Sequence, residues 1–150
     1  MFGDIYAQAV MVAAVITVTF AFWKGDEPER MSAAAYALVF LAATMIKGGA
    51  AANVPRWGVT ALEIILLIVF IVIAQHSRRA WLVWAASFQG LIVTSHVLVA
   101  ASLRPPLVGA ATVTNMSAYA LLISMAVGTF WAWQERRAAS MASSSDPRLL

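Results

Sequence analysis

The sequence predicts an all-α membrane protein, a polytopic helical bundle with about five transmembrane helices. Of its 150 residues, 62% are hydrophobic and only 11% are charged, whereas soluble domains average roughly 45–50% apolar and 25% charged residues. The mean hydropathy is +0.81. A water-soluble fold has too little interior to bury so many apolar side chains, so lipid is the expected solvent.

Five apolar segments, separated by short polar breaks, define the expected membrane spans. Each approaches the roughly 20 residues that cross a hydrocarbon core of ~30 Å. Helices are expected because a backbone in lipid must satisfy its own hydrogen bonds, and barrel strands would be shorter and alternating. Residues 1–137 are therefore expected to form one bundle. Its spans are predicted at residues 5–23, 31–50, 57–76, 81–103 and 113–133.

The two ends of the chain differ in composition. The N-terminal residues lack the positively charged region of a cleavable signal peptide, so the first apolar segment is expected to be a membrane helix. Residues 138–150 are rich in serine and have little apolar surface. We expect them to form a disordered cytoplasmic tail.

The positions of lysine and arginine predict the orientation of the bundle. Cytoplasmic loops carry an excess of these residues, and one side of the expected bundle holds most of them. That side holds Lys24, Arg30, Arg78, Arg79, Arg136, Arg137 and Arg148, and the other holds Lys47, Arg56 and Arg104. The N-terminus is therefore expected outside and the C-terminus in the cytoplasm. Five tryptophans are predicted in the cytoplasmic interface: Trp23, Trp81, Trp84, Trp131 and Trp133.

Several function classes find no support in the sequence. The pI is near 9.8, but the basic residues are scattered and form no stripe typical of a nucleic-acid-binding surface. The chain has no cysteine, which excludes disulfides, thiolate zinc sites and iron–sulfur clusters. No phosphate-binding glycine loop, metal-ligand cluster or Ser–His–acid set is recognisable. These absences favour a role other than catalysis.

Ionisable residues inside membrane spans are costly, and each is a candidate functional residue. Glu63 is expected roughly 9 Å below the outer boundary and His96 roughly 12 Å, at a rise of about 1.5 Å per residue. This shared depth predicts a polar cluster in the outer half of the bundle, either for binding or for structure. Its predicted members are Lys47, Glu63, Gln89, His96, Asn115 and Tyr119.

Structural roles compete with functional ones at these positions. Lys47 precedes a pair of glycines and fits a lysine that reaches to the membrane surface. Glu63 could pair with Lys47 or Arg56, and such a salt bridge is expected if the cluster forms. His96 could hydrogen-bond between helices, serve in a proton relay, or act as the single axial ligand of a tetrapyrrole. A bis-histidine haem is excluded because His76 lies at the opposite membrane boundary.

Three further patterns predict local structure. The acidic segment at residues 26–29 is expected to be a solvated hairpin turn. Pairs of small residues, such as Ala85-Ala86, favour close helix packing. The third span is bulky from Ile64 to Ile73 and is expected to face lipid.

The segment Trp84-Ala85-Ala86-Ser87-Phe88-Gln89, followed by Thr94-Ser95-His96 and by Tyr119, resembles a pattern in uncharacterised small proteobacterial inner-membrane proteins. The resemblance covers the last three spans. It implies a location in a bacterial inner membrane and implies no activity.

The leading functional hypothesis is an accessory or scaffolding subunit of a larger inner-membrane complex. It rests on small size, small-residue helix faces and the absence of a catalytic set, and it implies a membrane-protein partner or a homo-oligomer. A second hypothesis is a small transporter or ligand-binding protein that uses the polar cluster. A third is a tetrapyrrole- or pigment-associated protein with His96 as its ligand.

Overall fold

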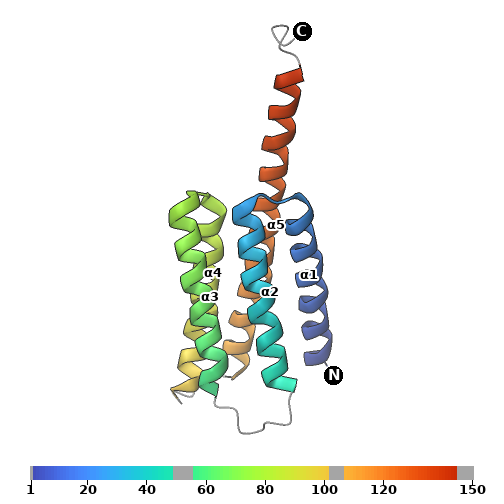
Figure 1. Cartoon of the computed structure of the whole chain (residues 1–150). Coiled ribbons are helices and arrows are strands. Elements are labelled where there is room, and N and C mark those ends of the chain that lie inside the picture. The colour runs from blue at the N-terminus through green and yellow to red at the C-terminus, as the bar shows by residue number, and fades with distance from the viewer. Residues whose placement is uncertain (1, 49–55, 102–106, 145–150) are drawn as a thin grey trace.

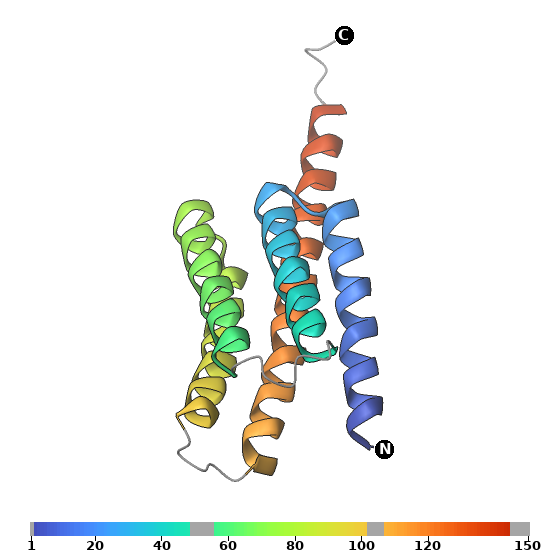
Figure 2. The same cartoon turned by 60° about the horizontal axis from the view of Figure 1, so that its bottom comes forward.

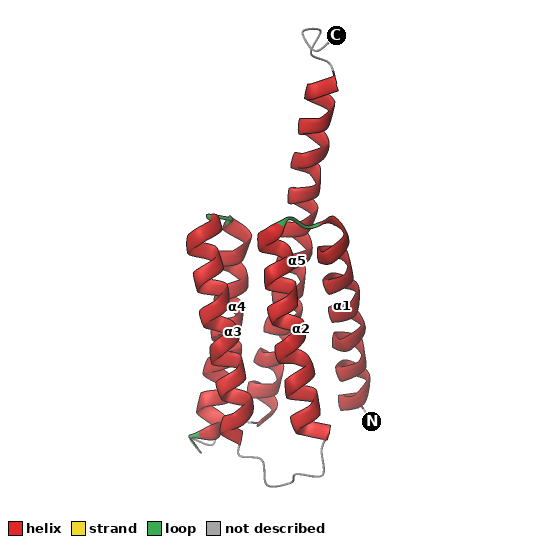
Figure 3. Cartoon of the chain, viewed as in Figure 1, coloured by secondary structure: helices red, strands yellow, loops and turns green. Residues whose placement is uncertain are grey.

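The structure, a computed structural model, describes residues 2–48, 56–101 and 107–144, with side chains for residues 8–46, 57–99, 101 and 109–142. The described residues form helices joined by short turns, which confirms the predicted all-α fold (Figure 3). The five helices are α1 (Phe2–Lys24), α2 (Glu27–Gly48), α3 (Arg56–Ser77), α4 (Ala80–Ala100) and α5 (Leu107–Ser144) (Figure 1).

Successive helices run in opposite directions and pack side by side (Figures 1 and 2). Helix α5 also returns to α1, so the five helices close into a ring. Two-residue turns join α1 to α2 and α3 to α4, and both turns lie at the same end of the bundle (Figure 1). Arg78, in the second turn, adopts a left-handed conformation (φ 52°), which ends α3 as the residue after a helix commonly does.

Within the described residues, four helices are long and apolar enough to cross a membrane. These stretches are Glu27–Ile46, Trp57–Ser77, Ala80–Val99 and Gly109–Ala142. Among the described side chains, α1 adds a shorter apolar stretch, Gln8–Lys24, and its crossing stays a prediction. Large apolar side chains are exposed on the outside of every helix, which is the pattern of a protein whose surroundings are lipid. The chain is therefore a small helical membrane protein.

Helix α3 has one face that is exposed and one that is buried. Ile65, Ile68 and Val72 are more than half exposed, whereas Leu66 and Phe70 are buried against the neighbouring helices. The bulky segment thus has the outward face that its sequence predicts, and its other face belongs to the core.

Small residues occupy the contacts between helices. Alanines are buried on α1, α2, α4 and α5, including Ala21, Ala33, Ala85 and Ala132, each with no exposed surface. Small side chains let backbones approach closely, and in lipid this packing replaces the hydrophobic effect as the main source of helix association.

The C-terminal segment differs from the prediction. Residues 138–144 were expected to be disordered, but α5 continues through them to Ser144 and extends beyond the other helices (Figure 1). Ala138, Ala139 and Ala142 are strong helix formers, and lengthening a packed helix avoids the cost of nucleation. Residues 145–150 of the predicted tail lie outside the described residues.

Candidate functional site

A cavity of about 400 Å³ lies between the helices, and all five contribute residues to its wall. Four members of the predicted polar cluster line it: Glu63, Gln89, His96 and Asn115. Glu63, His96 and Asn115 lie in the parts of α3, α4 and α5 that are remote from the two-residue turns, and Gln89 lies at the middle of α4. Glu63 and His96 thus line the same cavity.

The side chain of Gln89 holds Glu63 in place. Gln89 is 1% exposed, and its Nε2 donates to the Glu63 carboxylate oxygen Oε2 at 2.7 Å and to the Glu63 backbone carbonyl at 3.2 Å. A buried amide without such partners would carry a large desolvation cost. The pair therefore links α3 to α4 and fixes a carboxylate in the cavity wall.

An aromatic pair from α2 forms another part of the wall. Tyr36 and Phe40 lie one helical turn apart and stack with ring centroids 6.0 Å apart. Both line the cavity, and Tyr36 is buried. Tyr36 was not among the members predicted for the polar cluster. The i, i+4 spacing of Tyr36 and Phe40 is visible in the sequence. The sequence does not show which face of α2 turns toward the interior of the bundle.

The remaining predicted members are not part of the described wall. Tyr119 is half-buried on α5, one turn beyond the cavity-lining Asn115. The side chains of Lys47 and Arg56 lie outside the described ones, so the salt bridge predicted for Glu63 stays a prediction. His96 lines the cavity, and its Nδ1 atom is shielded from the surroundings.

The rest of the wall is mainly apolar, with Val39, Leu66, Ile92 and Ala118 among its members. The volume is at the lower end of the roughly 300–1,000 Å³ of small-molecule sites. A mostly apolar cavity whose wall includes a few polar groups suits a ligand that has an apolar body and one polar group.

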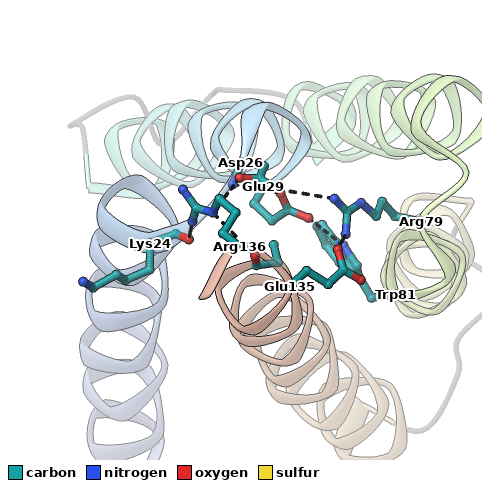
Figure 4. A network of polar contacts seen from close by, with 8 residues as sticks. Lys24, Asp26, Glu29, Arg79, Trp81, Glu135 and Arg136 are labelled. Carbon is teal, nitrogen blue, oxygen red and sulfur yellow. Dashed lines mark hydrogen bonds and ion pairs between the residues drawn. The ribbon is translucent and has the colours of Figure 1, made fainter. Parts of the chain in front are cut away.

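A second polar feature lies at the end of the bundle that carries the two-residue turns (Figure 4). Asp26 precedes the first residue of α2, and its backbone N–H donates to Glu29 Oε2 at 3.0 Å. This is one half of a capping box, in which a glutamate at the third helical position satisfies a backbone donor of the cap. The other carboxylate oxygen of Glu29 accepts from Trp81 Nε1 at 3.1 Å, so the cap of α2 is joined to the start of α4.

Ion pairs connect the same end to α5. Arg79 lies 3.4 Å from Asp26 and 2.8 Å from Glu135, and Arg136 Nε lies 2.9 Å from Asp26. Arg136 also donates to the backbone carbonyl of Lys24, at the end of α1. This end network, comprising Asp26, Glu29, Arg79, Trp81, Glu135 and Arg136, ties both turns to α5 (Figure 4).

The end network corrects one expectation. Glu29 was expected in a solvated turn, but it is 1% exposed because it caps α2 and also accepts a hydrogen bond from the indole of Trp81. The depth expected for Trp81 stays a prediction, and its side chain is buried within the bundle. The spacing from Asp26 to Glu29 signals a capping box in the sequence. The contact with Trp81 spans 52 residues and has no such signal.

The fold and the cavity define the class: a small helical membrane protein with a largely apolar cavity between its helices. No family model, curated protein sequence or solved structure matches the chain. Arguments about its function therefore rest on the cavity and its surroundings.

Proposed function

We propose that this protein binds a small amphipathic molecule that carries a protonated amine, within the intramembrane cavity. The observation that carries the proposal is the Glu63 carboxylate, which Gln89 fixes in an otherwise largely apolar wall built by five helices. An ionisable group at this depth is costly unless it has a partner or a function.

The chemistry of the wall favours a cationic ligand group. Gln89 donates to Oε2, and no other described side chain donates to the carboxylate, which leaves Oε1 as an acceptor for a ligand. The described part of the wall contains no lysine or arginine. The stacked Tyr36 and Phe40 add aromatic faces, which attract cations as well as apolar groups.

Binding of a matched pair of ligands tests the proposal. We expect naphthylmethylamine to bind the protein in nanodiscs more tightly than naphthylmethanol, which has nearly the same shape without the charge. Glu63→Gln should weaken amine binding roughly 10- to 100-fold, since a hydrogen bond to a charged group contributes about 1.5–3 kcal/mol, and should leave binding of the alcohol unchanged. Isothermal titration calorimetry, with empty nanodiscs subtracted, measures both.

Glu135→Gln is the matched control, because it removes a carboxylate that is exposed and remote from the cavity. Equal binding of amine and alcohol, or an equal loss in the Glu135 variant, would contradict the proposal. A Soret band in protein purified from native membranes would instead identify a tetrapyrrole as the occupant, with His96 as its candidate ligand.

A second candidate function is that of an accessory subunit, and the observation in its favour is the extension of α5. Every described residue from Gln134 to Ala142 is exposed, and an isolated helical segment of this length is marginally stable in water. A partner's surface would stabilise it.

Site-specific cross-linking tests the accessory role. The chain has no cysteine, so Met141→Cys places a single thiol on the extension, where Met141 is 63% exposed. We expect one stoichiometric cross-linked product in native membranes. Val83→Cys, on the exposed face of α4, is the control. Scattered, substoichiometric products from both variants would argue against a fixed partner.

A further inference from the structure

We propose that the end of the bundle where α1 stops and α5 leaves it carries a binding site for the phosphate headgroup of an anionic phospholipid. The site consists of Lys24 and Arg137, which are held around the indole of Trp133, with Trp23 beside Lys24. It is separate from the cavity and does not depend on the function proposed for the cavity.

Two cations share one aromatic ring at this site. Arg137 Cζ lies 4.8 Å from the centroid of the Trp133 ring and Lys24 Nζ lies 5.7 Å from it. Lys24 Nζ also lies 5.4 Å from the centroid of Trp23. The rings position the two side chains from different helices and leave their charges available to an anion.

Lys24 and Arg137 differ from the neighbouring arginines in their lack of a carboxylate partner among the described side chains. Arg79 and Arg136 are paired with Asp26 and Glu135 in the end network. Among the described side chains, no carboxylate pairs with Lys24 or Arg137. The side chain of Lys24 points away from the end network, although its carbonyl oxygen accepts from Arg136 (Figure 4).

The contact between Arg136 and the end of α1 also sets the spacing of the two cations. It holds Lys24, the last residue of α1, against Arg136 of α5, which directly precedes Arg137. Lys24 is thus fixed beside α5 by its backbone, while its ammonium remains outside. The site is assembled by the fold and is not a chance approach of two flexible side chains.

The depth of the site fits a headgroup. Tryptophans concentrate where the membrane meets water, and Trp23 and Trp131, which flank this end of the bundle, are both more than half exposed. A lipid phosphate lies at this level. Each basic residue close to an anionic membrane surface contributes measurably to attraction, so two residues in one site favour phosphatidylglycerol over phosphatidylcholine.

Retention of lipid by the intact protein tests the proposal. Native mass spectrometry of the detergent-purified chain, titrated with phosphatidylglycerol or phosphatidylcholine, counts the lipids that stay bound. We expect one phosphatidylglycerol to be retained preferentially. The double variant Lys24→Gln, Arg137→Gln should weaken its binding roughly 30-fold, while phosphatidylcholine binding stays unchanged.

The matched control is Arg30→Gln with Arg78→Gln, which removes the same charge from exposed positions near the same turns. It should change retention less than about twofold. An equal loss in both double variants would show that only overall charge matters and would overturn the proposal. Displacement of the lipid by millimolar inorganic phosphate would also overturn it, because the site would then select a free anion. Lys24→Arg with Arg137→Lys, which keeps both charges, should retain the lipid.

Discussion

Gly128→Ala is expected to lower the apparent Tm of the purified protein by roughly 5–10 °C, corresponding to about 2–3 kcal/mol for overpacking a core. A Cβ at this position would lie 2.4 Å from the Cγ and Cδ2 atoms of the Trp81 ring. The ring is buried and donates to Glu29, so it cannot move aside without losing that hydrogen bond. Even one methyl group therefore disturbs the packing of α5 on α4.

Gly90→Ala is the matched control for this prediction. A Cβ at Gly90 would meet nothing within 4 Å, and alanine is the better helix former by roughly 0.5–1 kcal/mol. We expect an unchanged or slightly higher Tm, measured by the same thermal unfolding assay in detergent. If both substitutions had the same effect, the close contact between Gly128 and Trp81 would not be limiting.

Glu29→Leu is expected to destabilise the protein by about 2–6 kcal/mol, because it leaves one buried and one partly buried donor without an acceptor. These donors are the Asp26 backbone N–H and Trp81 Nε1–H, and each costs about 1–3 kcal/mol when unsatisfied. The loss should appear as a lower Tm and as a changed tryptophan emission.

Glu29→Gln separates the hydrogen bonds from the shape of the side chain. The amide keeps one acceptor oxygen but presents a donor where the second oxygen was, so its Tm should fall between those of the wild type and the leucine variant. Equal stability of the leucine variant and the wild type would show that the buried capping box contributes nothing to the fold.

The fold was predictable from the sequence because apolar segments of membrane length have few alternatives. Lipid excludes unpaired backbone groups, so each such segment had to be a helix. The extension of α5 was not predicted, because residues 138–144 have little apolar surface and were therefore expected to be disordered. Alanine-rich residues that continue a packed helix need no hydrophobic face to remain helical.

The polar cavity was predictable in part. The sequence could predict that Glu63 and His96 lie at a similar depth, because the depth of a residue in a membrane follows from its position along the span. The rotation of each helix about its axis does not follow from such counting, and it separates Tyr36, which lines the cavity, from Tyr119, which does not. The end network lay beyond prediction for a related reason. Glu29 and Trp81 meet only after two hairpins have been packed together.

The end network also has a mechanical consequence. Salt bridges and two tight turns fasten all five helices at one end, and the cavity lies toward the other end, where α3 and α5 begin. The residues that keep the bundle assembled at the end network are therefore distinct from those that line the cavity. The stability of the bundle and the selectivity of the cavity can thus change by mutation independently of each other.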